Sequence, residues 1–172
     1  MIIGVMSDSH DNMLNVEKAF KVFSESNVEV IVHLGDIISP FIVRKMIQLS
    51  WSGLKVYAVY GNNDGDKYLL QKLFNKNNWV ISEAPTIIEI SGKKLLLMHG
   101  YNGPDFTKNL AYSIVRHMNI DILLYGHTHE KDYKIIDGKI VLNPGEVYGY
   151  LSGEASVALI DLEKMKVEFI KL

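Results

Sequence analysis

The chain has 172 residues, of which 48% are hydrophobic and 22% are charged, and its formal net charge is −2. This composition is ordinary for a globular protein and gives no basic face of the kind that binds nucleic-acid phosphates. Cysteine is absent, which excludes disulfides, a thiolate zinc site and a thiol nucleophile. We expect one domain over residues 1–172. We also expect a cytoplasmic location, since no basic leader and no apolar run of membrane-spanning length stands out.

The first half of the chain alternates apolar runs with amphipathic segments. Runs at residues 2–6, 30–34 and 56–60 predict buried strands. Asn12, Pro40 and Asp66 mark the starts of three predicted helices, because capping side chains and a proline at the first helical position favour helix initiation. This half therefore follows the strand–helix alternation of α/β folds.

Short strand patterns dominate the second half. They fall at residues 87–90, 93–98, 122–125, 133–136, 140–142, 157–161 and 167–170. A single further helix is predicted from the apolar positions Ala111, Ile114, Val115 and Met118. Because strands outnumber helices here, we expect a mixed pair of sheets and not one doubly wound sheet.

Side chains that can bind metal follow five of the predicted strands. They are Asp8 and His10, Asp36, Asn62, His99, and finally His127 and His129. Ligands of open α/β sheets bind outside the carboxyl ends of the strands, so these residues can meet at one rim. The pairs Asp8/His10 and His127/His129 are two residues apart, which in extended backbone places both side chains of a pair on the same face.

These seven donors indicate two metal ions and not one. Seven ligands are too many for a single tetrahedral zinc, but they suit two ions that share a carboxylate. Oxygen and imidazole ligands without sulfur favour manganese, iron, nickel, cobalt or zinc over calcium. Two such ions outweigh the two aspartates in charge, so the site would attract a phosphate ester and could hold a hydroxide as nucleophile.

The same residues resemble the five ordered blocks of a known family. Asp8-Ser9-His10, Gly35-Asp36, Gly61-Asn62, His99-Gly100 and Gly126-His127-Thr128-His129 are similar to the blocks of the calcineurin-like metallophosphoesterase superfamily. The resemblance implies a four-layer α-β-β-α sandwich with two mixed β-sheets. It also implies that Asp8, His10, Asp36 and His129 hold one metal. Asp36, Asn62, His99 and His127 would hold the other, with Asp36 bridging. Asn143-Pro144-Gly145 is similar to a motif of the small prokaryotic phosphodiesterase branch.

The third block departs from the pattern of many family members. They carry a histidine after the Gly-Asn pair, and it protonates the leaving alcohol, whereas this chain has Asn63. Asparagine is no general acid near neutral pH, and loss of such a group typically costs on the order of 10²–10⁴ in rate. The departure keeps open a non-catalytic, metal-binding scaffold, because the retromer subunit of similar fold also lacks this histidine.

Several polar and aromatic residues near the blocks have structural interpretations. We expect His33 to be a hydrogen-bonded histidine in the core or beside the site. Asp11 and Asp64 are expected to cap the helices that follow them. Tyr101, Tyr148 and Tyr150 are expected to serve packing or a subunit contact. The only two arginines, Arg44 and Arg116, fall within predicted helices, so no guanidinium clamp for a phosphomonoester is evident.

The sequence therefore predicts a metal-dependent phosphodiesterase that acts on a small phosphodiester substrate. Its cofactors would be two divalent transition metal ions, manganese first, with nickel, iron, cobalt or zinc as alternatives. Asp36 would help hold a bridging hydroxide, while His99 and His127 stabilise the developing charge. A homo-oligomer stays open, because the edge strand at 167–170 could pair with another copy. A nucleotide-binding module is disfavoured, since neither a G-x-G-x-x-G nor a phosphate-binding Lys-Ser/Thr loop is present.

Overall fold

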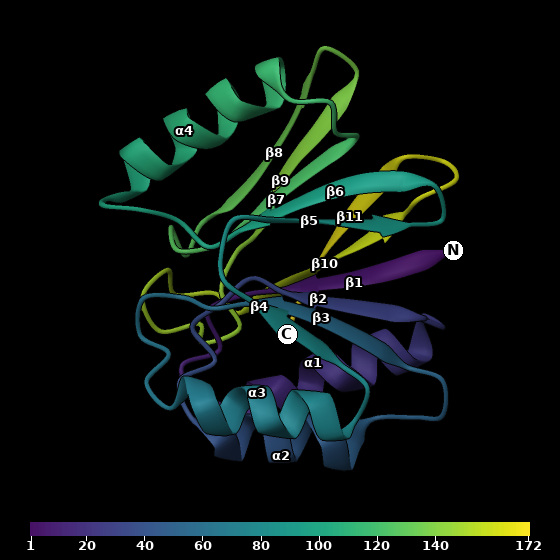
Figure 1. Cartoon of the computed structure of the whole chain (residues 1–172), viewed down its shortest axis with the longest axis vertical. Helices are drawn as coiled ribbons and strands as arrows, with labels where there is room; N and C mark the ends of the chain where they lie inside the picture. The colour runs from purple at the N-terminus through teal and green to yellow at the C-terminus, as the bar shows by residue number, and fades with distance from the viewer.

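A computed structural model describes residues 1–172 and shows two β-sheets packed face to face (Figure 1). The first sheet has the order β11-β10-β1-β2-β3-β4. Its strands are β1 (Ile2–Met6), β2 (Val30–His33), β3 (Lys55–Val59), β4 (Val80–Ser82), β10 (Ser156–Asp161) and β11 (Lys166–Lys171). β1 to β4 run parallel, and β10 and β11 complete the sheet in antiparallel pairing. The first sheet is therefore mixed.

The second sheet has the order β5-β6-β7-β9-β8 and is mixed as well. It contains β5 (Thr86–Ile90), β6 (Lys93–Met98), β7 (Ile122–Tyr125), β8 (Lys131–Ile136) and β9 (Lys139–Pro144). β6, β7 and β9 are parallel neighbours, whereas β5 and β8 pair antiparallel at the edges.

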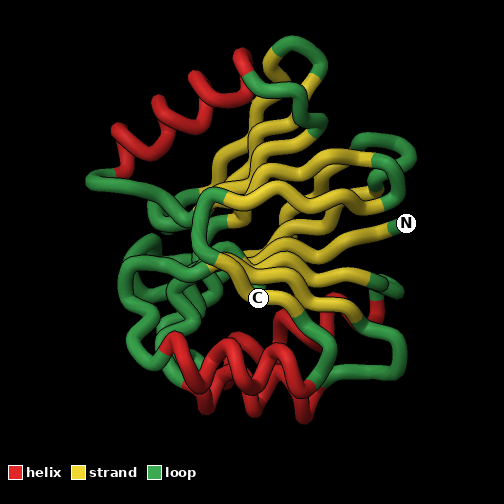
Figure 2. The backbone as a smooth tube through the Cα atoms, in the orientation of Figure 1, coloured by secondary structure: helices red, strands yellow, loops and turns green.

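Helices cover the two outer faces of the sheet pair (Figure 2). α1 (Met13–Glu25), α2 (Pro40–Leu49) and α3 (Lys67–Lys76) pack on the first sheet, and α4 (Pro104–His117) packs on the second. Three apolar clusters fill the interfaces, and the middle one joins the sheets through side chains such as Val5, Val32 and Leu124. The predicted four-layer α-β-β-α sandwich is confirmed. None of the four helices is long and apolar enough to cross a membrane.

The predicted helix starts agree with the structure. The side chains of Asn12 and Asp66 accept hydrogen bonds from the backbone N–H groups of Asn15 and Leu69, at 3.1 and 3.0 Å. Pro40 opens α2. β4 was not predicted from the sequence, because this edge strand has only three residues and is too short to show an alternating pattern.

Parallel strands from both sheets bring their carboxyl ends to one rim. In the first sheet the backbone N–H of Asp8 donates to the carbonyl of Gly35 at 3.0 Å. In the second sheet the backbone N–H of Gly126 donates to the carbonyl of His99 at 2.9 Å. The two sheets meet where the backbone N–H of His127 donates to the Asp8 carboxylate at 3.0 Å. The loops after β1, β2, β3, β6 and β7 therefore surround one region.

His33 ends β2 as a fully buried side chain, with Nε2 3.1 Å from the Ser9 hydroxyl. Burial lowers the pKa of His33 from 6.5 to about 3. The unfolded chain therefore binds a proton here that the folded chain rejects, so this residue destabilises the fold as pH falls through 6.5. Between pH 8 and pH 5 we expect it to remove about 2 kcal/mol from the free energy of unfolding.

Urea unfolding of metal-free protein at both pH values measures this effect, with His33→Gln as the comparison. The variant keeps a polar side chain that does not titrate. Its free energy of unfolding should therefore fall by about 2 kcal/mol less between pH 8 and pH 5 than that of the wild-type protein. Equal declines in the two proteins would contradict the buried neutral histidine.

Candidate metal centre

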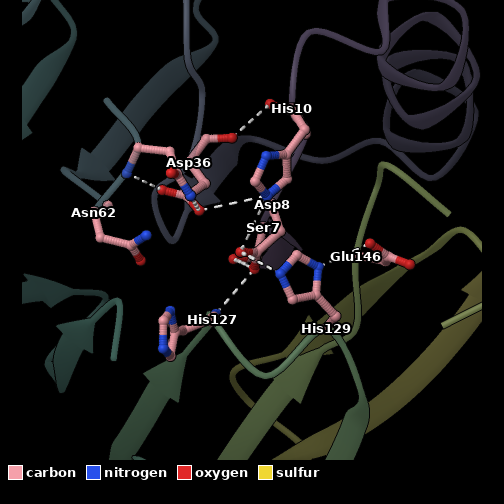
Figure 3. A network of polar contacts seen from close by, with 12 residues as sticks. Ser7, Asp8, His10, Asp36, Asn62, His127, His129 and Glu146 are labelled. Atoms are coloured by element: carbon pink, nitrogen blue, oxygen red, sulfur yellow. Dashed lines mark hydrogen bonds and ion pairs between the residues drawn. The ribbon is translucent and has the colours of Figure 1, made fainter. Parts of the chain in front are cut away.

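The structure brings all seven predicted donor residues together at the common rim. Figure 3 shows Asp8 and Asp36 in the middle, His10 and His129 on one side, and Asn62 and His127 on the other. We call Asp8, His10 and His129 the Asp8 group, and Asn62, His99 and His127 the Asn62 group. Asp36 lies between the two groups.

The Asp8 group contains two buried polar atoms that have no hydrogen-bond partner. They are Asp8 Oδ1 and His10 Nε2. These atoms lie 3.9 Å apart, and His129 Nε2 lies 3.7 Å from the same carboxylate oxygen. The other oxygen, Oδ2, accepts hydrogen bonds from the Ser7 hydroxyl and from the backbone N–H of His127. Oδ1 is thus left for a ligand at the position that both imidazoles face.

In the Asn62 group, two ring nitrogens and one amide oxygen face one another with their lone pairs. His99 Nδ1 donates to the Leu34 carbonyl at 2.7 Å, and His127 Nε2 donates to the Asn102 carbonyl at 2.6 Å. In the neutral rings the other two nitrogens therefore carry lone pairs. His99 Nε2 lies 3.3 Å from His127 Nδ1 and 2.9 Å from Asn62 Oδ1. With both rings neutral, these lone pairs repel one another, and a cation bound between the atoms would remove the repulsion.

Asp36 faces one histidine from each sheet. Its Oδ2 lies 3.4 Å from His10 Nε2, which follows β1, and its Oδ1 lies 3.6 Å from His99 Nε2, which follows β6. The residue is almost completely buried, at 1% exposure. One carboxylate can therefore contribute an oxygen to each group. The unpartnered atoms and the facing lone pairs show that these residues fit divalent cations.

Burial also sets the protonation that metal binding requires. It lowers the pKa of His10 and of His99, which keeps both imidazoles neutral. Neutral imidazole is the form that binds metal. Burial raises the pKa of Asp8 well above its usual range, and nearby Asp36 and Glu146 add to the rise. A cation at Asp8 Oδ1 would counter this shift by favouring the charged carboxylate.

The expectation of extended backbone at the donor pairs is wrong. Five of the seven donors have left-handed backbone, with φ of 52° at Asp8, 39° at His10, 55° at Asp36, 69° at His127 and 61° at His129. Non-glycine residues rarely adopt this region, and it costs of order 1–3 kcal/mol each. The donors of each pair reach the same centre because the backbone curls after the strand.

Asp64 binds backbone groups of the Asp36 loop, and Asp66 caps the helix that follows, so the expectation that Asp64 caps a helix is wrong. Its carboxylate accepts hydrogen bonds from the backbone N–H groups of Asp36, Ile38 and Gly61, at 3.1, 2.7 and 2.7 Å. Gly61 is required there, because a β-carbon would collide with the Asp36 carboxylate. Buried Asp64 thus fixes two of the site loops together.

Asp11 also differs from its predicted capping role. Its carboxylate accepts hydrogen bonds from the backbone N–H of Ser39 at 3.2 Å and from the Ser39 hydroxyl at 2.6 Å. Asn12, not Asp11, caps the helix that follows. Asp11 therefore fixes Ser39, the residue that directly precedes α2.

The three tyrosines have different surroundings. Tyr148 packs beside His10, with ring centroids 5.3 Å apart, and the ring of Tyr150 lies 5.7 Å from that of Tyr148. The Tyr101 hydroxyl donates to the carbonyl of Ala84 at 3.1 Å. The packing role is confirmed for Tyr148, which limits how the imidazole of His10 can turn.

Two residues that contact the donors were not assigned these roles from the sequence. Asn63 donates to both oxygens of Asp36, from its backbone N–H at 2.9 Å and from its side-chain amide at 2.8 Å. Glu146 accepts a hydrogen bond from His129 Nδ1 at 2.8 Å. Glu146 directly follows Asn143-Pro144-Gly145, but no strand-end pattern marks it as part of the site.

Comparisons with known proteins identify the family of the chain. The family model described as the calcineurin-like phosphoesterase superfamily domain matches residues 1–165. Over its whole length the chain is 34% identical to phosphodiesterase MJ0936 of Methanocaldococcus jannaschii, covering 99% of that protein. It is 30% identical to a probable metallophosphoesterase of Methanothermobacter thermautotrophicus, with 99% of this chain and 92% of that protein covered.

Solved structures show the same fold. A structure described as a novel archaeal phosphodiesterase superposes with a TM-score of 0.88 at 35% identity, and each chain is covered completely. The zinc complex of Vps29 from Entamoeba histolytica has a TM-score of 0.69 at 20% identity, covering 100% of this chain and 98% of that chain, and shares the fold alone. The chain therefore belongs to the calcineurin-like phosphoesterase superfamily.

Proposed function

We propose that this protein is a phosphodiesterase that works with two divalent metal ions. The observation that carries the proposal is the position of Asp36, whose two oxygens face histidines of opposite sheets at 3.4 and 3.6 Å. The Asp8 group with Asp36 would hold one ion, and the Asn62 group with Asp36 would hold the other. The phosphodiesterase descriptions of two relatives support the choice of reaction.

The metal ions, when bound, supply Lewis acidity toward the phosphoryl oxygens and activate water at neutral pH. The chain itself keeps the donors in place. Backbone carbonyls of Leu34 and Asn102 fix the rings of His99 and His127 with their free nitrogens toward the centre. These two histidines line the position where negative charge would develop on the phosphoryl group, and Asp36 orients the centre between them. We assign the catalytic roles to these three residues.

A small diester suits the site better than a monoester. A phosphomonoester carries a second negative charge, and binding of that dianion usually involves a guanidinium. Neither arginine belongs to the donor groups, since Arg44 lies in α2 and Arg116 lies near the end of α4. Manganese is the first metal to test. The carboxylate, amide and imidazole donors, with no sulfur among them, also suit nickel, iron, cobalt and zinc.

A metal-binding scaffold is the second candidate function. Asn63 leaves the chain without a proton donor at that position, and it holds Asp36 instead. In addition, the large apolar side chains of Leu14, Phe41 and Tyr68 are exposed in the first turns of α1, α2 and α3. Those turns follow the strands that carry the donors, so a partner could bind beside the metal centre. A scaffold would bind metal without metal-stimulated hydrolysis.

The first test is a matrix of metals and substrates. Manganese-loaded protein should hydrolyse bis(4-nitrophenyl) phosphate, and it should act more slowly on 4-nitrophenyl phosphate. Asp36→Asn should lower kcat for the diester by about 100-fold or more, because it removes the carboxylate charge that would face both ions. Asp137→Asn, in an exposed turn, is the matched control and should keep full activity. Metal binding with no hydrolysis would support the scaffold instead.

Asn63→His should raise the rate on esters with poor leaving groups, because an imidazolium there can protonate the departing alkoxide. Gains of up to about 10²-fold are expected on alkyl esters, with little change on nitrophenyl esters. Asn63→Ala also loses the hydrogen bond from the side-chain amide to Asp36 but adds no proton donor, so the difference between the variants isolates the effect of the acid. If both variants respond alike on both ester classes, the leaving-group proton comes from elsewhere.

A further inference from the structure

A cavity of about 200 Å³ adjoins the Asn62 group. Asn62 and His99 line it on one side, and Tyr60, Lys67, Glu83 and Tyr101 are among the residues that complete it. At about 30 Å³ per water molecule it has room for roughly seven waters. That is less than the 300–1,000 Å³ of a typical ligand site, but it is enough for one part of a substrate.

The charges on the wall of this cavity cancel. Lys67 Nζ lies 3.1 and 3.2 Å from the two carboxylate oxygens of Glu83. The same ammonium lies 4.8 Å from the centre of the Tyr60 ring. Because the positive charge is already paired, an additional anionic group on a ligand would gain little here. The wall favours an uncharged group.

Tyr101 supplies an aromatic surface that is held in place. Its hydroxyl donates to the Ala84 carbonyl at 3.1 Å, and its backbone N–H donates to the Thr107 hydroxyl at 3.0 Å. With its hydroxyl and its backbone N–H both hydrogen-bonded, the residue is still 42% exposed. Rings stack favourably on such a surface because little conformational entropy is lost.

We propose that this cavity is the subsite for one ester substituent of the diester, an uncharged group that contains a ring. The proposal rests on the proposed phosphodiesterase function. It places the phosphoryl group at the metal centre and the ring of the substituent against Tyr101. The pairing of Lys67 with Glu83 leaves no unpaired positive charge on this wall for a substituent that carries a further phosphate.

Two diesters with the same leaving group test the subsite. Bis(4-nitrophenyl) phosphate retains an aryl substituent after hydrolysis, whereas methyl 4-nitrophenyl phosphate retains a methyl group. Wild-type protein should have the lower KM for the bis-aryl ester. Tyr101→Ala should raise that KM about three- to tenfold, with kcat nearly unchanged. Tyr101→Leu keeps apolar bulk and should give a smaller rise.

Tyr133→Ala is the matched control, because Tyr133 is exposed to nearly the same degree (41%) but lies on the edge strand β8. A rise in KM for both esters in Tyr101→Ala would still support the subsite, with the leaving aryl group bound there. Unchanged KM values for both esters would overturn it. If wild-type protein hydrolyses neither ester, the proposed function fails, and this is a separate result.

A second inference concerns Glu146, a fully buried carboxylate next to the Asp8 group (Figure 3). One oxygen accepts the hydrogen bond from His129 Nδ1 at 2.8 Å. The other accepts from the backbone N–H and the hydroxyl of Ser152, at 2.6 and 2.7 Å. With three donors directed at it, the carboxylate is held as an acceptor in a fixed position.

Glu146 differs from the groups that hold the Asn62-group histidines. The outer nitrogens of His99 and His127 donate to neutral backbone carbonyls. His129 alone of these three donates to a carboxylate. A carboxylate acceptor fixes the tautomer of an imidazole and makes its other nitrogen a stronger metal ligand. The nitrogen concerned is Nε2, which faces Asp8.

We infer that Glu146 is a positioning residue that acts through His129 on the ion of the Asp8 group. Its segment is built into the site as well. The backbone N–H groups of Val147 and Tyr148 donate to the carbonyls of Ser7 and Asp8, at 2.9 and 3.0 Å. Glu146 therefore ties the segment after β9 to the loop after β1 and orients His129 between them.

Zinc titration by calorimetry, together with NMR of the histidine ring nitrogens, tests this role without an activity assay. Glu146→Ala should weaken one of the two zinc sites by about 10- to 100-fold and leave the other unchanged. It should also remove the Nδ1–H signal of His129. Glu146→Gln still offers an amide oxygen to Nδ1–H, so it should restore the tautomer but only part of the affinity.

Glu154→Gln is the control, because Glu154 lies near the same segment but its side chain pairs with Lys131 and Lys171. It should leave both zinc sites unchanged. Retention of both affinities and of the His129 tautomer in Glu146→Ala would overturn the inference. A Glu146→Ala protein that weakens both sites equally would show a general structural defect and would overturn it too.

Discussion

A single buried carboxylate connects the two halves of this site. Asp36 leaves the first sheet after β2, and its two oxygens face imidazoles that leave different sheets, His10 after β1 and His99 after β6. A charge buried to this degree is costly unless it is compensated. Asn63 compensates part of it through two hydrogen bonds, and the cations would compensate the rest. The rims of two sheets must therefore meet at one residue before the centre can exist.

The loops around Asp36 have strained backbone, and the packing of the surrounding sandwich offsets the cost of this strain. Five donors adopt left-handed backbone, and so does Ile38, a β-branched residue for which φ of 78° is unusual. Backbone hydrogen bonds from Asp8 to Gly35 and from His10 to Asp36 hold these turns at 3.0 and 3.1 Å. Donors held in place before the metal arrives lose little entropy when it binds, which favours a rigid centre.

The sequence predicted those features that a local pattern marks, such as a polar side chain directly after an apolar strand. Apolar runs end just before the donors, so a mixed pair of sheets and the gathering of all seven donors could be predicted from the pattern. The four-layer order of the sandwich was implied only by the resemblance to the family. Contacts that depend on tertiary packing could not. Asp64 and Glu146 contact backbone groups and side chains from distant segments, and no local spacing reports such partners. The left-handed turns were missed because the two-residue spacing of Asp8/His10 suits extended and curled backbone equally.

The segment that follows β9 has a consequence for how the protein folds. Asn12 donates to the carbonyl of Tyr148, 136 residues away along the chain, and β10 pairs with β1 in the first sheet. The Asp8 loop therefore has its final neighbours only after most of the chain has left the ribosome. Contacts of this separation slow folding, because a long loop must close before they form. In a nascent chain, Asp8 and His10 would thus be accessible to metal ions well before the folded site that holds an ion has formed.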